Sequence, residues 1–123
     1  MNTKKQEDWK EAVKEFKELK KENDLVILSA WYTNYAFSYY YDRKIFEKHN
    51  TLIYNLKKQN IYFVSKLDDK AFMDFNPKQR IITIQSHEKD DDPENTVSNT
   101  IAKHYNLTEQ INFAGIKMKI YSK

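Results

Sequence analysis

Hydrophobic positions near the start of the chain follow a helical repeat. Apolar residues recur every three or four positions from residue 9 to residue 19, which is the spacing of one helix face; they are Trp9, Ala12, Val13, Phe16 and Leu19. Thr3-Lys4-Lys5-Gln6 has the spacing of a capping box, and Asn23 suits a left-handed helix stop. We therefore predict an amphipathic helix that starts near Lys4, ends near Asn23 and lies across a sheet.

An apolar run without alternation follows and predicts the central strand. Leu25 to Leu28 are all aliphatic, and such a run is typical of a strand that helices cover on both faces. We predict a strand over residues 25–31 and an aromatic loop over residues 32–41. The loop would lie at the carboxyl end of the strand, which is where ligands and partners meet sheets of this kind.

Asp42 opens the next predicted helix. Its carboxylate suits an N-cap, so we expect a helix from Arg43 to about Gln59, with a stop at Asn60. The apolar face of this helix comprises Ile45, Phe46, His49, Leu52, Ile53 and Leu56. We interpret His49 as a hydrogen-bonded core histidine rather than a ligand. Residues 61–65 form a second strand, and this strand–helix–strand unit predicts parallel strands with a right-handed crossover.

The last part of the chain contains further strands and one well-marked helix start. We interpret residues 71–75 as a short strand or a single turn, and residues 80–86 as the third strand. Asp92-Pro93-Glu94 combines a cap, a proline and an acid, and predicts a helix start. The inward positions of that helix are Val97, Ile101 and either Tyr105 or His104. Alternating apolar residues from 111 to 120 predict a terminal hairpin or one kinked strand.

These elements define an α+β fold in a single domain. An N-terminal helix is followed by the order β-α-β-β-α-β, which is compatible with a ferredoxin-like or similar sheet with helices packed on it. A chain of 123 residues is long enough for one stable core. We therefore assign residues 1–123 to one domain.

Composition excludes several kinds of site. The chain has no cysteine and a single glycine, Gly115. Disulfides and thiolate metal sites are therefore excluded, and so are glycine-rich phosphate and dinucleotide loops, so we expect no cofactor. A Lys- and Glu-rich start and the lack of any apolar run of about 20 residues predict a cytoplasmic protein without signal peptide or membrane span. Frequent Lys, Asn, Ile and Tyr indicate an AT-rich genome or mobile element.

The aromatic stretch provides the candidate binding residues. Tyrosine offers an apolar ring and a polar tip while few torsions are frozen, and it is enriched at recognition surfaces. From Arg43 to Lys66 the chain carries six basic residues and one acidic residue, which would add a cationic rim. The candidates are Trp31, Tyr32, Tyr35, Phe37, Tyr39, Tyr40, Tyr41, Arg43, Lys44 and Lys48. The alternative is that most of these rings complete the core.

Three short motifs resemble a family of small uncharacterised α/β proteins found in phage and bacterial genomes. They are Leu28-Ser29-Ala30-Trp31, then Asn50 with Leu52 and Leu56, and then Ile101-Ala102-Lys103-His104-Tyr105. The resemblance implies a similar α/β fold and brings no chemistry with it; the Tyr-rich stretch departs from the family, which is shorter and more polar there. In size, composition and lack of catalytic motifs, the chain is also similar to phage-borne inhibitors of host defence, including anti-CRISPR proteins.

Catalysis finds less support in the sequence. His87 and Glu88 end the third strand, whereas Asp68 and Asp69 follow the second. If these strands are antiparallel neighbours, the two groups lie apart and cannot share a metal. The triple aspartate at 90–92 lacks the glycine of a calcium loop, and no serine lies in a glycine-flanked elbow.

Three functions follow from these observations. The first is a non-enzymatic interaction protein, encoded by a phage or mobile element, that binds and inhibits a nucleic-acid-processing complex such as a host defence nuclease. Its partner would be a protein or ribonucleoprotein complex, and its own oligomeric state stays open. The second is direct binding of RNA or another single strand, with Tyr62, Phe63 and the nearby tyrosines as stacking rings. The third is a small metal-dependent hydrolase.

Overall fold

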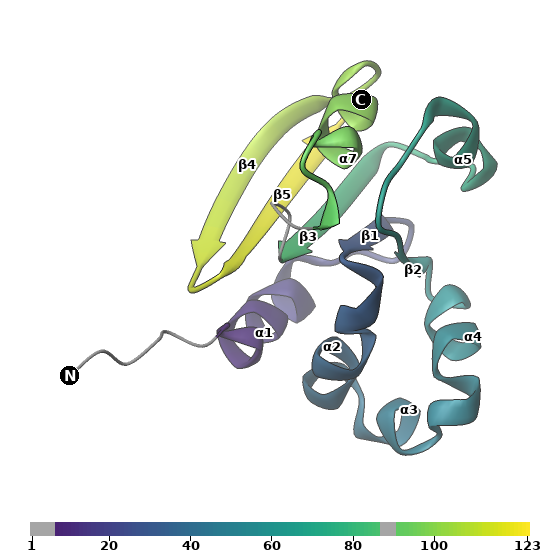
Figure 1. Cartoon of the computed structure of the whole chain (residues 1–123), viewed down its shortest axis with the longest axis vertical. Helices are drawn as coiled ribbons and strands as arrows, with labels where there is room; N and C mark the ends of the chain where they lie inside the picture. Colours follow the sequence, from purple (N-terminus) through teal and green to yellow (C-terminus); the bar gives the residue numbers. More distant parts are fainter. Residues whose placement is uncertain (1–6, 87–90) are drawn as a thin grey trace.

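The computed structural model describes residues 7–86 and 91–123, which form a mixed five-stranded sheet between helices (Figure 1). The strands are β1 (Leu25–Ser29), β2 (Ile61–Phe63), β3 (Arg80–Ser86), β4 (Asn106–Phe113) and β5 (Ile116–Ser122). They lie in the order β2-β1-β3-β5-β4. β1 pairs in parallel with β2 and β3, whereas β5 is antiparallel to β3 and β4.

Helices cover both faces of the sheet, with an apolar cluster under each group. On one face lie α1 (Trp9–Leu19), α2 (Asn34–Tyr41), α3 (Arg43–Glu47) and α4 (Leu52–Lys57). On the other face lie α5 (Asp69–Asp74) and α7 (Thr96–Ala102). Alternate residues of β1 enter the two clusters, Val26 and Leu28 in the first and Leu25 and Ile27 in the second. This two-sided burial is the reason that β1 has no polar alternation.

The predicted α+β class is confirmed. β1 and β2 are parallel, β3 has the predicted bounds of residues 80–86, and the chain ends in a hairpin closed by Phe113 and Ile116. The hairpin turns at Gly115, whose φ of 71° favours glycine. α1 buries the predicted apolar face; its start is set by Asp8, whose Oδ1 accepts from Glu11 N at 3.1 Å. The predicted capping box at residues 3–6 lies outside the described residues.

The connection between β2 and β3 differs from the ferredoxin-like order. Residues 69–74 form helix α5 where a short strand or turn was predicted. Asp68 begins this helix, because its Oδ1 accepts from Ala71 N at 2.8 Å. With a helix inserted, β3 returns on the far side of β1 and runs parallel to it. The element order after α1 therefore alternates strands and helices until the final hairpin.

The predicted helix over residues 43–59 is interrupted. α3 ends at Glu47, Lys48 has a non-helical backbone (φ −97°, ψ 58°), and a 3-10 turn (η2, His49–Thr51) leads into α4. Because this break changes the helical phase, His49 and Ile53 are exposed rather than buried. The interpretation of His49 as a core histidine is therefore wrong.

The helix predicted from Pro93 begins later. α7 starts at Thr96, after Asn95 in the left-handed region (φ 57°). Asp92 still acts as a cap across this turn, since its carboxylate accepts from Thr96 N at 3.0 Å, Thr96 Oγ1 at 2.8 Å and Val97 N at 3.0 Å. Tyr105 is buried, whereas His104 is exposed.

Candidate binding surface

The aromatic stretch after β1 is helical, which corrects the predicted loop. A 3-10 turn, η1 (Trp31–Thr33), leads directly into α2. Thr33, Phe37 and Tyr41 are four residues apart and face the core, so one side of the helix is held by packing even though aromatic residues have modest helix propensity. Ser38 supports the turn, because its hydroxyl donates to Asn34 O at 2.6 Å.

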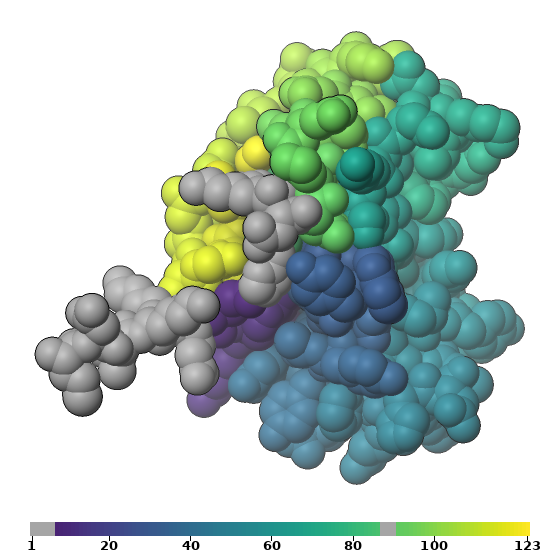
Figure 2. Space-filling view, viewed as in Figure 1, coloured from purple at the N-terminus to yellow at the C-terminus, as the bar shows by residue number. Residues whose placement is uncertain are grey.

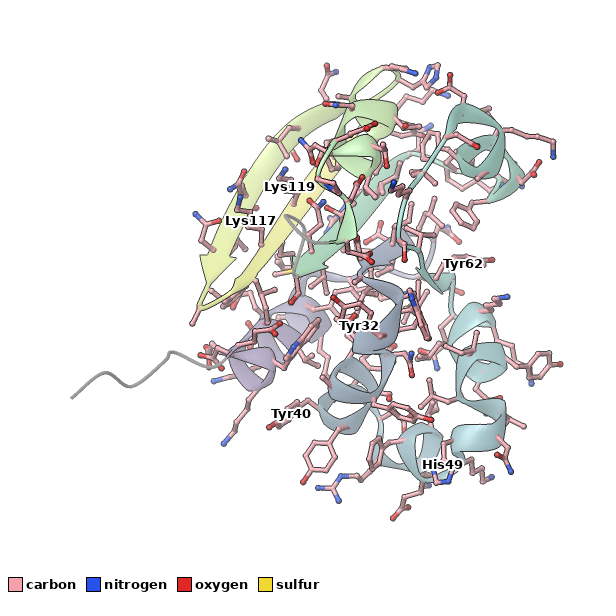
Figure 3. The ribbon with its side chains drawn as sticks, in the orientation of Figure 1. Tyr32, Tyr40, His49, Tyr62, Lys117 and Lys119 are labelled. Atoms are coloured by element: carbon pink, nitrogen blue, oxygen red, sulfur yellow. The ribbon has the colours of Figure 1, made fainter. Side chains whose placement is uncertain are left out.

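The remaining rings point away from the core. Trp31, Tyr32, Tyr35, Tyr39 and Tyr40 are all exposed, with fractions from 39% to 57%. Tyr32, Tyr35 and Tyr39 follow the i, i+3, i+7 spacing of one helix face. We name Tyr32, Tyr35, Tyr39 and Tyr40 the tyrosine face. Figure 2 shows the segment that carries it, in blue, at the surface, and Figure 3 labels Tyr32 and Tyr40.

Phe37 and Tyr41 are predicted binding residues, but Phe37 lies in the core and Tyr41 packs half-buried against it. Phe37 is fully buried, and the centroids of its ring and that of Tyr41 are 5.0 Å apart in a stacked pair. Phe16 of α1 packs against both rings. The Tyr41 hydroxyl donates to Gln59 Oε1; burial, and then the charge of Asp42, raise the pKa of this hydroxyl. The aromatic stretch thus contributes rings to the core and also leaves rings exposed.

The predicted cationic residues lie at the end of the tyrosine face. Asp42 begins α3, where its Oδ1 accepts from Lys44 N at 3.0 Å and Ile45 N at 3.4 Å. The guanidinium carbon of Arg43 thereby lies 4.1 Å from the ring centroid of Tyr39, a cation–π contact. Lys44 and Lys48 are exposed.

Tyr39 is held in place by neighbouring rings and by Arg43. Tyr39 makes edge contacts with Tyr40 and with Phe46, at centroid distances of 4.9 and 5.1 Å. Because Arg43 also covers Tyr39, these side chains have fewer rotamers to lose when a partner binds. A surface arranged in this way binds at lower entropic cost.

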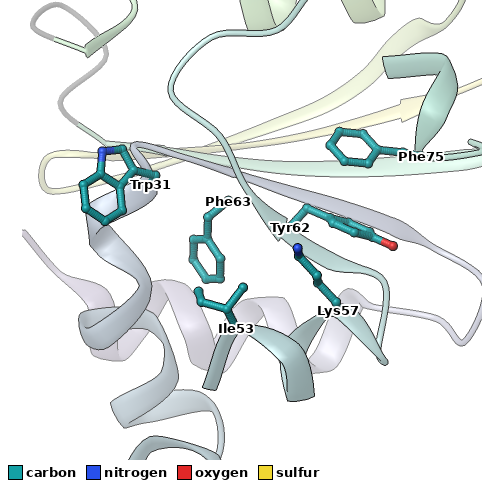
Figure 4. A pocket seen from close by; sticks show the side chains of 6 residues that line it. All are labelled: Trp31, Ile53, Lys57, Tyr62, Phe63 and Phe75. Atoms are coloured by element: carbon teal, nitrogen blue, oxygen red, sulfur yellow. The ribbon is translucent and has the colours of Figure 1, made fainter. Parts of the chain in front are cut away.

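Trp31 belongs to a second surface, an apolar groove beside the edge strand β2. The groove has a volume of about 330 Å³ and is lined by Trp31, Ile53, Lys57, Tyr62, Phe63 and Phe75 (Figure 4). Tyr62 and Phe75 pack with ring centroids 4.6 Å apart. Ile53, Lys57 and Phe75 were not among the predicted binding residues. The break at Lys48 turns Ile53 outward. The regular apolar spacing of residues 45–56 did not predict this break, because it is compatible with one continuous helix.

The carboxylates considered for a metal site have structural partners. Because β2 and β3 both run parallel to β1, their carboxyl ends lie at the same edge, and the assumption that they are antiparallel neighbours is wrong. Asp68 nevertheless caps α5, and Asp69 pairs with Lys103 at 3.2 Å. His87 and Glu88 lie outside the described residues. Within the described residues, no three His, Asp or Glu side chains form a group that could hold a metal ion.

Comparisons with protein-family models, curated proteins and solved structures gave no match to this chain. The phage and bacterial resemblance therefore stays a prediction. In residues 7–86 and 91–123, no helix combines the length and the apolar character that crossing a bilayer requires.

Proposed function

We propose that this chain is a non-enzymatic interaction protein that binds a protein or ribonucleoprotein partner through its tyrosine face. The observation that carries the proposal is the exposure of four tyrosines on η1 and α2, with Arg43 stacked on Tyr39. Tyrosine and arginine are the residue types enriched at binding hot spots. Aromatic anchors at i, i+3 and i+7 also match the way in which a helix face enters a partner's groove.

The partner class that we propose is a nucleic-acid-processing complex. Arg43, Lys44 and Lys48 lie in sequence directly after the tyrosines and are exposed, which suits a partner that has an acidic rim or carries nucleic acid. In its most specific form, the proposal is inhibition of a host defence complex by a phage-encoded protein. This form rests on the sequence resemblance and on the lack of catalytic motifs.

A double substitution tests the tyrosine face. Tagged Tyr35→Ala/Tyr39→Ala protein should lose, by at least about tenfold, the partners that the unchanged chain captures from cell extract, because each hot-spot aromatic contributes about 2 kcal/mol or more. Tyr54→Ala is the matched control, since Tyr54 is an exposed tyrosine of α4, outside the tyrosine face. Quantitative mass spectrometry measures the capture. Equal capture by all three proteins would contradict the proposal.

Binding of single-stranded RNA is the second candidate, favoured by the groove beside β2. Trp31, Tyr62 and Phe63 supply rings for base stacking there, and Lys57 supplies a cation. A gel shift across a range of salt concentrations extends the same test. RNA binding predicts an affinity that falls steeply as salt rises and that Trp31→Ala weakens. A partner that is protein alone predicts no shift at any salt concentration.

A further inference from the structure

β1 and β3 are adjacent parallel strands whose connections leave toward opposite faces of the sheet. The chain passes from β1 to α2, α3 and α4 on one face, and from β3 to α7 on the other (Figure 1). In open sheets with parallel strands, a crevice forms outside the carboxyl ends of two such strands, and ligands bind there. Ser29 and Gln85 lie at these two carboxyl ends and are register partners.

Polar side chains cross the sheet in two rows at this end. Gln85 is the register partner of both Ser29 and Lys117, and Thr83 is the register partner of Lys119. Side chains of register partners share one face of the sheet. α7 covers this face, because Ser98 donates to Gln85 Oε1 at 3.3 Å and accepts from Lys119 Nζ at 3.0 Å.

Within these rows, three buried side chains have hydrogen-bonding atoms without a partner. The atoms are Ser29 Oγ, Thr83 Oγ1 and Gln85 Nε2, and the residues are at most 1% exposed. A buried polar atom without a partner destabilises a fold, and such local conflicts are expected at functional sites. All three atoms can donate, and the ammonium of Lys119 contacts Ser98 on the same face. The complementary ligand atom is therefore an oxygen that carries negative charge.

We propose that the sheet end formed by the carboxyl ends of β1 and β3 binds a small oxyanion, a phosphate or carboxylate group, through Ser29, Thr83 and Gln85. The positive charge of Lys119 lies beside these donors. The three donor atoms have no contact with solvent. Lys117, at the end of the row that contains Ser29 and Gln85, is exposed (Figure 3). In this proposal the anion enters near Lys117 when side chains there change conformation. The site is separate from the tyrosine face, and its test does not depend on the proposed macromolecular partner.

A titration followed by NMR tests the proposal on the full chain. Inorganic phosphate, with acetate as a second arm and chloride as the ionic-strength control, should give saturable shifts at Ser29, Thr83 and the side-chain amide of Gln85. Ser29→Ala should weaken binding by about tenfold, because it removes a hydrogen bond to a charged group. Ser38→Ala is the matched control, since that buried hydroxyl already donates to Asn34 O. Binding of acetate alone identifies the group as a carboxylate. Saturation by neither anion overturns the proposal.

Thermal unfolding of two threonine variants gives a readout that does not need ligand binding. Thr83 and Thr100 are both buried, but the Thr100 hydroxyl donates to Leu67 O at 3.1 Å. Without phosphate, Thr83→Val should keep or raise Tm, because it removes an unpartnered hydroxyl, whereas Thr100→Val should lower it. Phosphate should raise the Tm of the unchanged chain by more than it raises that of Thr83→Val. An equal loss of Tm in both variants would mean that an internal water satisfies Thr83 and would overturn the proposal.

Discussion

At the scale of single residues, the tyrosines divide into two environments. Tyr105 and Tyr121 lie in the core, and Tyr41 packs half-buried against it; burial is the main cause that raises the pKa of each hydroxyl. Tyr35 and Tyr39, on the same helix as Tyr41, are exposed. The same residue type therefore both fills the core and forms the proposed binding surface.

The buried tyrosines predict a loss of stability at alkaline pH. A pKa raised above the ordinary value of 10.0 means that the folded state holds its proton more tightly than the unfolded state. The contribution of these protonated tyrosines to the free energy of unfolding is therefore complete below pH 10, and it is lost as pH rises through their pKa values in the folded state. Urea unfolding across this range should show the decrease. Tyr41→Phe should make the unfolding free energy decrease less steeply with pH. At neutral pH the same variant should lose about 1 kcal/mol of unfolding free energy, because the hydrogen bond to Gln59 is lost. An unchanged slope would contradict this account of Tyr41.

Most of the candidate binding residues are exposed, as a binding surface requires, and two are not. Eight of the ten candidates are exposed; Phe37 is buried and Tyr41 is half-buried. Thr33, Phe37 and Tyr41 have helical spacing, but a stretch with aromatic rings on every side of the helix lacks the polar face that usually marks amphipathic helices. Its helical structure depends on packing against Phe16 and Phe63, which only the fold brings together.

At the scale of elements, the junction between α2 and α3 fixes the arginine beside the tyrosine face. The Asp42 cap turns the chain between the two helices, and Arg43 is the first residue of α3. Asp42→Ala should cost about 1 kcal/mol of unfolding free energy, as is usual for loss of an N-cap. Asp74→Ala is the control, because its pair with Lys70 is exposed and should contribute only about 0.3–0.5 kcal/mol. Urea unfolding of both variants measures the difference, and equal costs would contradict the capping role.

Elements with strong local signals were predicted, and those that depend on the fold were not. The sequences of β1, β3 and the terminal hairpin contain apolar runs or an alternation of apolar and polar residues, patterns that are typical of strands. The break at Lys48 has no glycine or proline to mark it. Helix α5 is six residues long and follows a capping aspartate, but the overlapping stretch of residues 71–75 is equally compatible with a short strand.

At the scale of the whole molecule, the parallel placement of β3 brings potential sites to one edge of the sheet. η1 and α2 follow the carboxyl end of β1, and the groove lies beside the carboxyl end of β2. Strand order could not be predicted, because it depends on whether residues 69–74 form a helix long enough to cross the sheet. The tyrosine face, the groove and the polar rows are consequences of this topology.

The central claim is that α2 holds its tyrosines outward as a preformed surface, and tyrosine acetylation followed by peptide mass spectrometry tests it most directly. Limited reaction of the folded chain should modify Tyr35 and Tyr40 about as fast as the exposed Tyr54. Tyr121 should react only after unfolding because it is buried, and Tyr41 should react more slowly than Tyr54 because it is half-buried and its hydroxyl donates to Gln59. If Tyr35 and Tyr40 were instead as slow as Tyr121, the tyrosine face would be buried and the proposed binding surface would not exist.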